Sequence, residues 1–185
     1  MGYFKLLIAI LGFLSFSFVP VTFAQVKIGH KVPDFVTTTL DGQRFALKEY
    51  LNQPGNKLLI LIFFATWCEP CGDDLKYLQK LHDQFKDQGL RVFCVFTGRI
   101  SKVKAAKEYL KKLDVNLPVL LDKRRVISKR YKVTGLPYNL AIDREGFLKF
   151  KCLGCGEDVK RKFEENLKDL WGRMNLVDTK VEVKY

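Results

Sequence analysis

A run of apolar residues that ends just before a pair of cysteines constrains the fold of this chain more than any other segment. Residues 58–65 read LLILIFFA, a run too short for an average helix that contains β-branched and aromatic side chains, so it predicts a strand buried on both faces. Cys68 and Cys71 follow in Trp-Cys-Glu-Pro-Cys, where we expect the strand to turn into a helix. The unpaired N–H groups and the dipole of a helix N-terminus stabilise a thiolate, which is the form that attacks disulfides. The pair therefore predicts a site of electron exchange.

Residues 1–24 have the pattern of a secretory signal peptide. One lysine precedes residues 6–19, which are apolar apart from two serines and one glycine, and the sequence TFA then offers small residues at the cleavage-recognition positions. We expect cleavage before Gln25. The alternative is an uncleaved membrane anchor, because residues 6–23 approach the length that spans a bilayer. Both alternatives place the rest of the chain outside the cytoplasm, in the periplasm or an equivalent extracytoplasmic space.

The length and charge of the remaining residues, 25–185, narrow the possibilities further. They fit one domain with an adequate core. The whole chain has a formal net charge of +12, from 32 basic and 20 acidic side chains. Its densest basic segment, 102–112, alternates with apolar positions and so favours a solvated helix face, although attraction to anionic headgroups or to an acidic protein stays open. We expect a monomer, and no nucleic-acid partner for an exported protein.

The five cysteines are not arranged as in a small disulfide scaffold. Cys68 and Cys71 form one closely spaced pair, and Cys152 and Cys155 form a second. Cys94 is left over within a strand pattern, so we interpret it as a small buried apolar side chain.

The remaining pattern predicts an α/β domain around a mixed sheet. Residues 36–40 and 43–47, joined by the turn Asp41-Gly42, predict a β-hairpin. Periodicity predicts helices over 70–86, 101–113 (with Ser101 as the N-cap), 124–131 and 157–174, and strands over 91–97, 117–121, 138–143 and 147–151. No internal repeat or inter-domain linker is visible in the sequence, which favours a single domain.

The cysteine motif, followed about seventy residues later by Gly135-Leu136-Pro137, resembles the thioredoxin fold. More narrowly, the chain is similar to the exported, membrane-associated thioredoxin-like thiol reductases of bacteria, the branch that includes those of cytochrome c maturation. This similarity is carried by Pro33-Asp34-Phe35, Leu40-Asp41-Gly42, the cysteine motif, residues 117–122, Leu136-Pro137 and residues 142–146. It covers about residues 28–172, and 98–122 resembles the helix–strand insertion of this branch. Peroxiredoxins share the Pro-Asp-Phe opening, but Ala65 stands where their peroxidatic site needs a threonine, so that alternative is set aside.

The cysteine motif also suggests how the site works. We expect Cys68, at the exposed tip of the turn, to attack a partner disulfide, and the less accessible Cys71 to resolve the mixed disulfide. Glu69 places a negative charge beside Cys68, which disfavours the thiolate and favours a reductant over an oxidant. The alternative is that Glu69 is solvated and has little effect, because exposed charges are screened.

The resemblance implies roles for residues around the two cysteines. Asp74 stands where the family usually has a glutamate that passes protons to and from the cysteines, although helix capping or solvent exposure would also explain it. Ile62 stands where ordinary thioredoxin buries an aspartate. Pro137 corresponds to the cis-proline of the family, which would free the backbone of Leu136 to pair with an extended substrate; a trans proline that opens a strand is the alternative. Trp67 would form a wall for the substrate, though packing alone could account for it.

The pair Cys152 and Cys155 departs from the family pattern. In this fold the last strand runs antiparallel to the one that Pro137 opens, so we expect the pair at the same edge as Cys68. Three interpretations stay open: a structural disulfide, a redox relay with Cys68 and Cys71, or a metal site of up to four thiolates. The chain has only two histidines and two methionines, so it offers few of the side chains that usually bind copper.

The resemblance implies an enzyme, a thiol–disulfide oxidoreductase that reduces disulfides of extracytoplasmic proteins such as apocytochrome c. It would need no metal or cofactor beyond its own cysteines and would receive electrons from a membrane donor. The alternative from another class is a metal-binding or metal-delivery module on a thioredoxin scaffold, with Cys68, Cys71, Cys152 and Cys155 as ligands.

Overall fold

The computed structural model of the chain describes residues 26–154, 156, 160–161 and 164–165. The expected signal segment 1–24, Cys155 and most of the expected helix over 157–174 lie outside the described residues. None of the helices that the structure describes is both long enough and apolar enough to cross a membrane.

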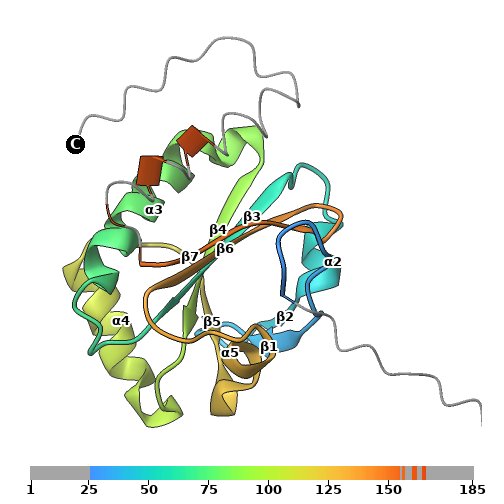
Figure 1. Ribbon diagram of the computed structural model, residues 1–185. Coiled ribbons are helices and arrows are strands. Elements are labelled where there is room, and N and C mark those ends of the chain that lie inside the picture. Colours follow the sequence, from blue (N-terminus) through green and yellow to red (C-terminus); the bar gives the residue numbers. More distant parts are fainter. Residues whose placement is uncertain (1–25, 155, 157–159, 162–163, 166–185) are drawn as a thin grey trace, which may run out of the picture.

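Five strands form the central sheet, in the spatial order β5–β4–β3–β6–β7 (Figure 1). They are β3 (Leu58–Phe64), β4 (Leu90–Phe96), β5 (Val119–Leu121), β6 (Tyr138–Asp143) and β7 (Leu148–Leu153). The strands β3, β4 and β5 are parallel, whereas β6 is antiparallel to both β3 and β7. The carboxyl ends of β3, β4, β5 and β7 therefore meet the amino end of β6 at one edge of the sheet.

This edge is named the rim, and it comprises residues 65–71, 97–102, 122–126, 133–137 and 153–154, which adjoin those strand ends. The opposite edge, where residues 144–147 connect β6 to β7, is named the distal edge. The loops that follow parallel strands in α/β proteins commonly carry functional residues, so the rim is the first place to look for the site.

Helices and a small hairpin cover the two faces of the sheet (Figure 1). One face packs against α3 (Cys71–Phe85) and α4 (Val103–Lys112). The other packs against α2 (Leu47–Leu51), α5 (Val126–Arg130) and the hairpin of β1 (Val36–Thr38) and β2 (Arg44–Ala46). Three short 3₁₀ helices complete the connections: η1 (Lys86–Gln88), η2 (Ile100–Lys102) and η3 (Lys123–Arg125).

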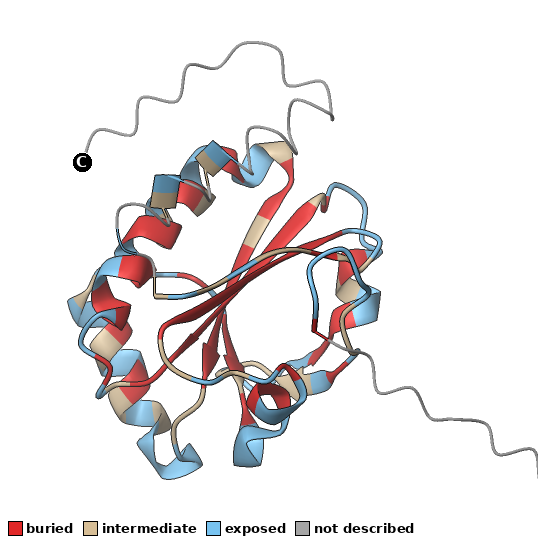
Figure 2. Ribbon diagram, in the orientation of Figure 1, coloured by how far each residue is buried: buried red, intermediate tan, exposed pale blue. Residues whose placement is uncertain are grey.

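The apolar run that the sequence predicts as a doubly buried strand is β3, and every residue of β3 is buried (Figure 2). Its even-numbered side chains pack on the α3 and α4 face, and its odd-numbered side chains pack on the opposite face. Because side chains alternate across a strand, a strand covered on both sides needs apolar residues at every position. The expected thioredoxin fold is confirmed, with its mixed sheet between helices, its N-terminal hairpin and its helix–strand insertion, α4 and β5.

Some element boundaries differ from the sequence prediction. Residues 47–51 form α2, because Leu47 and Leu51 lie one helical turn apart and are both buried on the same side. Ser101 is not the cap of α4, since η2 takes up that residue and the N-cap position of α4 has no side-chain hydrogen bond. The last strand, β7, continues to Leu153, so Cys152 lies within the strand rather than after it.

Candidate active site

Cys68 and Cys71 are joined in a disulfide at the amino end of α3, with their Cα atoms 5.4 Å apart. The chain leaves β3 at Phe64, and α3 begins at Cys71 with Pro70 in the N-cap position. The carbonyl of Cys68 accepts a hydrogen bond from the Cys71 N–H at 3.2 Å, so the turn between the cysteines leads directly into the helix. Both sulfurs therefore lie where the helix dipole favours a negative charge.

Cys68 is more covered than the sequence suggests. Only 3% of it is exposed, and Cys71 is fully buried, so the prediction that Cys68 lies at an exposed tip is wrong for this disulfide-bonded state. The reason is that both cysteines belong to the apolar cluster between the sheet and α3, and the turn packs onto the sheet instead of projecting from it. Trp67, in contrast, is exposed beside them. Little of either cysteine is therefore open to solvent in this state.

Asp74 lies one helical turn after Cys71 and is only 3% exposed, which rules out the alternative that it is a solvent-exposed carboxylate. Asn139, from β6, donates a hydrogen bond through Nδ2 to Asp74 Oδ2 at 3.0 Å. Asn139 is itself 1% exposed and pairs across the sheet with Ile62. A hydrogen-bonded carboxyl group is thus fixed inside the protein, on the same helix as Cys71.

Cys152 faces the same side of the sheet as this carboxyl group. It lies directly opposite Asn139 in the β6–β7 ladder, and directly opposed side chains lie on the same face. Burial, and secondly the nearby Cys152, raise the pKa of the Tyr138 hydroxyl. The structure therefore places Cys152 next to the rim and beside Asn139, the residue that is hydrogen-bonded to Asp74.

The peptide bond between Leu136 and Pro137 is cis, as the resemblance implies. Because Phe63 pairs with Tyr138, this bond lies beside the carboxyl end of β3, from which the loop to Cys68 departs. The Pro137 carbonyl accepts a hydrogen bond from the Gly154 N–H at 2.7 Å, whereas the backbone of Leu136 makes no hydrogen bond to the residues that the structure describes. Its N–H and C=O groups are available to an extended chain.

Tyr109 is a residue near the cysteines that the sequence reasoning missed. Its hydroxyl donates a hydrogen bond to the Cys68 carbonyl at 3.4 Å, and its ring stacks on Phe64 with ring centroids 6.4 Å apart. Burial, and secondly Asp73, raise the pKa of this hydroxyl and keep it protonated as a donor. A Cβ atom at Gly72 would lie 3.4 Å from the same hydroxyl, so the insertion helix α4 packs closely against the start of α3. Asn139 was missed as well, although a polar residue in an otherwise apolar strand is a usable signal.

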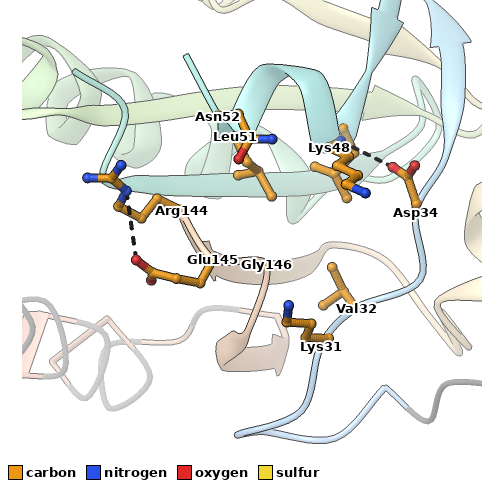
Figure 3. Close-up of a pocket in the computed structure, with 10 residues that line it drawn as sticks. Lys31, Val32, Asp34, Lys48, Leu51, Asn52, Arg144, Glu145 and Gly146 are labelled. Atoms are coloured by element: carbon orange, nitrogen blue, oxygen red, sulfur yellow. Dashed lines mark hydrogen bonds and ion pairs between the residues drawn. The ribbon is translucent and has the colours of Figure 1, made fainter. Parts of the chain in front are cut away.

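A hollow of about 420 Å³ lies at the distal edge (Figure 3), and neither cysteine of the disulfide lines it. On its lining, Arg144 lies 3.7 Å from Glu145, Asp34 accepts the backbone N–H of Lys48 at 3.1 Å, and the Lys31 ammonium lies 5.4 Å from the centre of the Phe147 ring. Among the described residues, no group of three or more histidine, cysteine or acidic side chains could hold a metal ion. The reactive groups therefore lie on the rim and not in this hollow.

Comparison with known proteins agrees with this geometry. The sequence model of the AhpC/TSA family matches residues 28–151. The thiol-disulfide oxidoreductase ResA of Bacillus thuringiensis subsp. konkukian (strain 97-27) is 32% identical over 146 residues, which cover 79% of this chain and 80% of that protein. The chain belongs to the AhpC/TSA family. ResA of Bacillus subtilis (strain 168) is also 32% identical, over 145 residues that cover 78% of each chain.

This member of the AhpC/TSA family shares its fold with solved thioredoxin-like proteins. A thiol:disulfide interchange protein of the thioredoxin family from Chlorobium tepidum TLS superposes with a TM-score of 0.61 at 24% identity, covering 76% of this chain and 94% of that chain. The relatives and the Cys68–Cys71 disulfide together identify the protein as an enzyme, a thiol–disulfide oxidoreductase.

Proposed function

We propose that this oxidoreductase works as an exported reductase of protein disulfides. The observation that carries the proposal is the disulfide at the amino end of α3 with two nearby carboxylates, the exposed Glu69 between the cysteines and the buried Asp74 one turn after Cys71. Negative charge near a thiolate disfavours it, so the dithiol holds its electrons less tightly and passes them on.

The reaction begins from the reduced form of the enzyme. The thiolate of Cys68 attacks one sulfur of a client disulfide, forming a mixed disulfide and releasing the other client sulfur as a thiolate, which takes up a proton. The thiol of Cys71 then loses its proton and attacks the Cys68 sulfur, which releases the client as a dithiol. Two electrons pass to the client, and the enzyme is left in the disulfide form that the structure describes.

Asp74 takes the role of proton acceptor and donor for Cys71. Residues three apart on a helix are neighbours, so the Asp74 carboxyl lies within one turn of the Cys71 sulfur. The hydrogen bond from Asn139 supports this role, because it fixes a side chain that is one methylene shorter than the glutamate of the related proteins. Asn139 acts as a positioning residue in this scheme.

The client would bind around the cis-proline. The backbone N–H and C=O of Leu136 make no hydrogen bond to the described part of the chain and lie beside the loop to Cys68, which suits the addition of an extended client strand. Trp67 is 77% exposed and would supply an apolar wall next to the reacting sulfur.

The setting of the reaction is also part of the proposal. The signal pattern in residues 1–24 supports export, with a cleaved signal or an anchor at residues 6–23. The resemblance to cytochrome c maturation reductases supports apocytochrome c or another extracytoplasmic protein as the client, and a membrane protein as the electron donor. The enzyme would act as a monomer with no cofactor beyond its own cysteines.

A redox titration against glutathione buffers tests the direction of the reaction. We expect a midpoint near that of thioredoxin, about −270 mV, and a less negative midpoint for Glu69→Gln because the charge that opposes the thiolate is removed. Glu145→Gln, at the distal edge, is the matched control and leaves the midpoint unchanged. A midpoint near that of the oxidant DsbA, about −120 mV, contradicts a reductase. Stoichiometric zinc or copper in the purified protein without disulfide turnover would favour the metal-delivery alternative instead.

A further inference from the structure

Most of the large apolar side chains that stay exposed in the described part of the chain lie on the rim. They are Trp67 (77% exposed), Ile100 (57%), Val126 (52%) and Leu153 (57%), and elsewhere only Ile28 and Val36 are as exposed. The four rim side chains adjoin the ends of β3, β4, β5 and β7, one at each strand. Exposed apolar groups that gather in one place mark an interaction site.

Exposed cationic side chains lie in the part of the rim that follows β4 and β5. Arg99 and Lys102 follow β4, and residues 123–125 (Lys-Arg-Arg) follow β5; all five side chains are exposed. No ion pair joins any of them to a carboxylate within the residues that the structure describes. In the described rim, Glu69 is the exposed acidic residue. This side of the rim therefore attracts negative charge.

Two of these arginines are held in place by an unusual backbone turn. Arg124 and Arg125 both have φ of 57°, in the left-handed region that residues other than glycine seldom adopt. The buried carboxylate of Asp122 accepts the N–H groups of Ile127 at 2.7 Å and Ser128 at 3.0 Å, and also the Ser128 hydroxyl. These bonds fix the turn that presents both guanidinium groups at the end of β5.

We propose that the rim binds an extended client segment that carries acidic residues on one side of its disulfide and apolar residues on the other side. The inference rests on the proposed function, because it specifies the client chemistry of the same site. Neighbouring strands lie about 4.8 Å apart, so five strand ends span roughly 19 Å, the length of about six extended residues. Such a segment would place its cysteine at Cys68, its acidic flank toward β4 and β5, and an apolar side chain toward Leu153.

A polypeptide fits this surface better than a membrane does. The cations lie beside a disulfide that must meet a sulfur atom, and the backbone of Leu136 offers hydrogen bonds to a strand. A bilayer seated on the rim would cover the disulfide and bring no sulfur to it. Charge attraction would act mainly on the rate of client association, and added salt would screen it.

Short peptides with one internal disulfide, flanked by glutamates, glutamines or lysines, test this inference. We expect the kcat/KM of the full-length enzyme to fall in the order glutamate, glutamine, lysine, with about tenfold between the extremes at low salt. The variant Arg124→Gln/Arg125→Gln should lose roughly threefold to tenfold on the glutamate peptide while the glutamine peptide is unaffected. Arg99→Gln/Lys102→Gln leaves the left-handed turn intact and should act in the same direction.

The matched control is Lys48→Gln/Arg144→Gln, which removes two positive charges at the distal edge and should leave all three rates unchanged. Equal rates on the three peptides, or an equal loss in this control, overturn the charge preference while leaving the reductase function standing. Failure to reduce any of the peptides overturns the reductase function itself and the inference with it. Binding to anionic vesicles that the rim variants lose, together with equal peptide rates, would assign the rim to a membrane surface and also overturn the inference.

Discussion

The rim and the distal edge are opposite edges of the same sheet, yet they differ in how many of their charged side chains form ion pairs. At the distal edge, Lys149 pairs with Asp143 at 3.2 Å and Arg144 with Glu145 at 3.7 Å. Asp143 also accepts the Phe147 N–H at 2.8 Å and closes the turn. At the rim, the cations after β4 and β5 have no such partners among the described residues, and large apolar side chains stay exposed.

The difference separates the distal edge, whose contacts stabilise the fold, from the rim, which we propose binds the client. The β6–β7 turn at the distal edge pairs Asp143 and Glu145 with neighbouring cations and closes on the Phe147 N–H, as a connection with a structural role should. Within the described residues, the rim exposes charged and apolar side chains, the Leu136 backbone makes no hydrogen bond, and the disulfide lies beside them. Substitutions at the rim or at the buried Asp74 beside it should therefore change rate or client preference, and matched substitutions at the distal edge should change stability or nothing.

The largest expected effect comes from Cys68→Ser. Serine offers no thiolate at neutral pH, so disulfide reduction should fall by at least about 10³-fold. Initial rates with a peptide disulfide measure the loss, and Cys71→Ser should instead accumulate the mixed disulfide with the client.

Cys94→Ala is the control for Cys68→Ser. Cys94 is fully buried in β4, and burial raises the pKa of its thiol, so it stays protonated and unreactive. A folded Cys94→Ala protein with normal rates is expected, and iodoacetamide should label the reduced enzyme at Cys68 and not at Cys94. Full activity in Cys68→Ser, or none in folded Cys94→Ala, would contradict the assignment of the reactive pair.

The next effect in size is that of Asp74→Asn. If Asp74 passes a proton to and from Cys71, the amide should slow reduction by about 10²-fold and remove one limb of the pH–rate profile. Asp143→Asn is the distal counterpart: it weakens the contacts to Lys149 and Phe147, lowers the free energy of unfolding by about 1 kcal/mol and leaves the pH–rate profile unchanged. An unaltered profile in Asp74→Asn would show that this carboxyl group moves no proton.

The sequence was sufficient to predict the parts of the site that local pattern encodes. A short apolar run rich in β-branched and aromatic residues favours a strand covered on both faces, and the cysteine pair after it indicates a strand-to-helix turn, so β3, Cys68 and Cys71 were predicted directly. Pro137 came from the resemblance, and its peptide bond is cis in the structure.

Residues that reach the site through tertiary packing were not predictable in the same way. Asn139 contacts Asp74 because β6 lies beside β3 with a given register, and neither segment encodes that register alone. Tyr109 reaches Cys68 only because α4 packs across the start of α3. The left-handed turn at Arg124 and Arg125 also gives no local signal, since no glycine marks it.

Asp122→Ala should have a smaller effect, on stability and on client preference together. It removes the acceptor for the N–H groups of Ile127 and Ser128, which should lower the free energy of unfolding by about 2 kcal/mol. The turn at the end of β5 then loosens, so the preference for acidic peptides should weaken while the redox midpoint stays fixed.

Asp34→Ala is the matched comparison for Asp122→Ala, because Asp34 likewise accepts a backbone N–H, that of Lys48 at 3.1 Å, at the start of a short helix. It borders the distal hollow in Figure 3, so it should cost about 1 kcal/mol and leave peptide preference untouched. An equal change of preference in both variants would remove the distinction between the two edges.

The smallest expected effect lies at His82, near the carboxyl end of α3 and far along the helix from Cys71. Burial lowers the pKa of His82, and this outweighs the opposing influence of Asp83. The unfolded chain therefore binds a proton more readily than the folded protein as the pH falls through about 6.5, so this part of the stability is complete above that pH and is lost below it. His82→Gln should flatten the fall in the urea midpoint between pH 8 and pH 5.5. Its reduction rates should be unchanged, and a rate change would mean that α3 transmits effects from its far end to the disulfide.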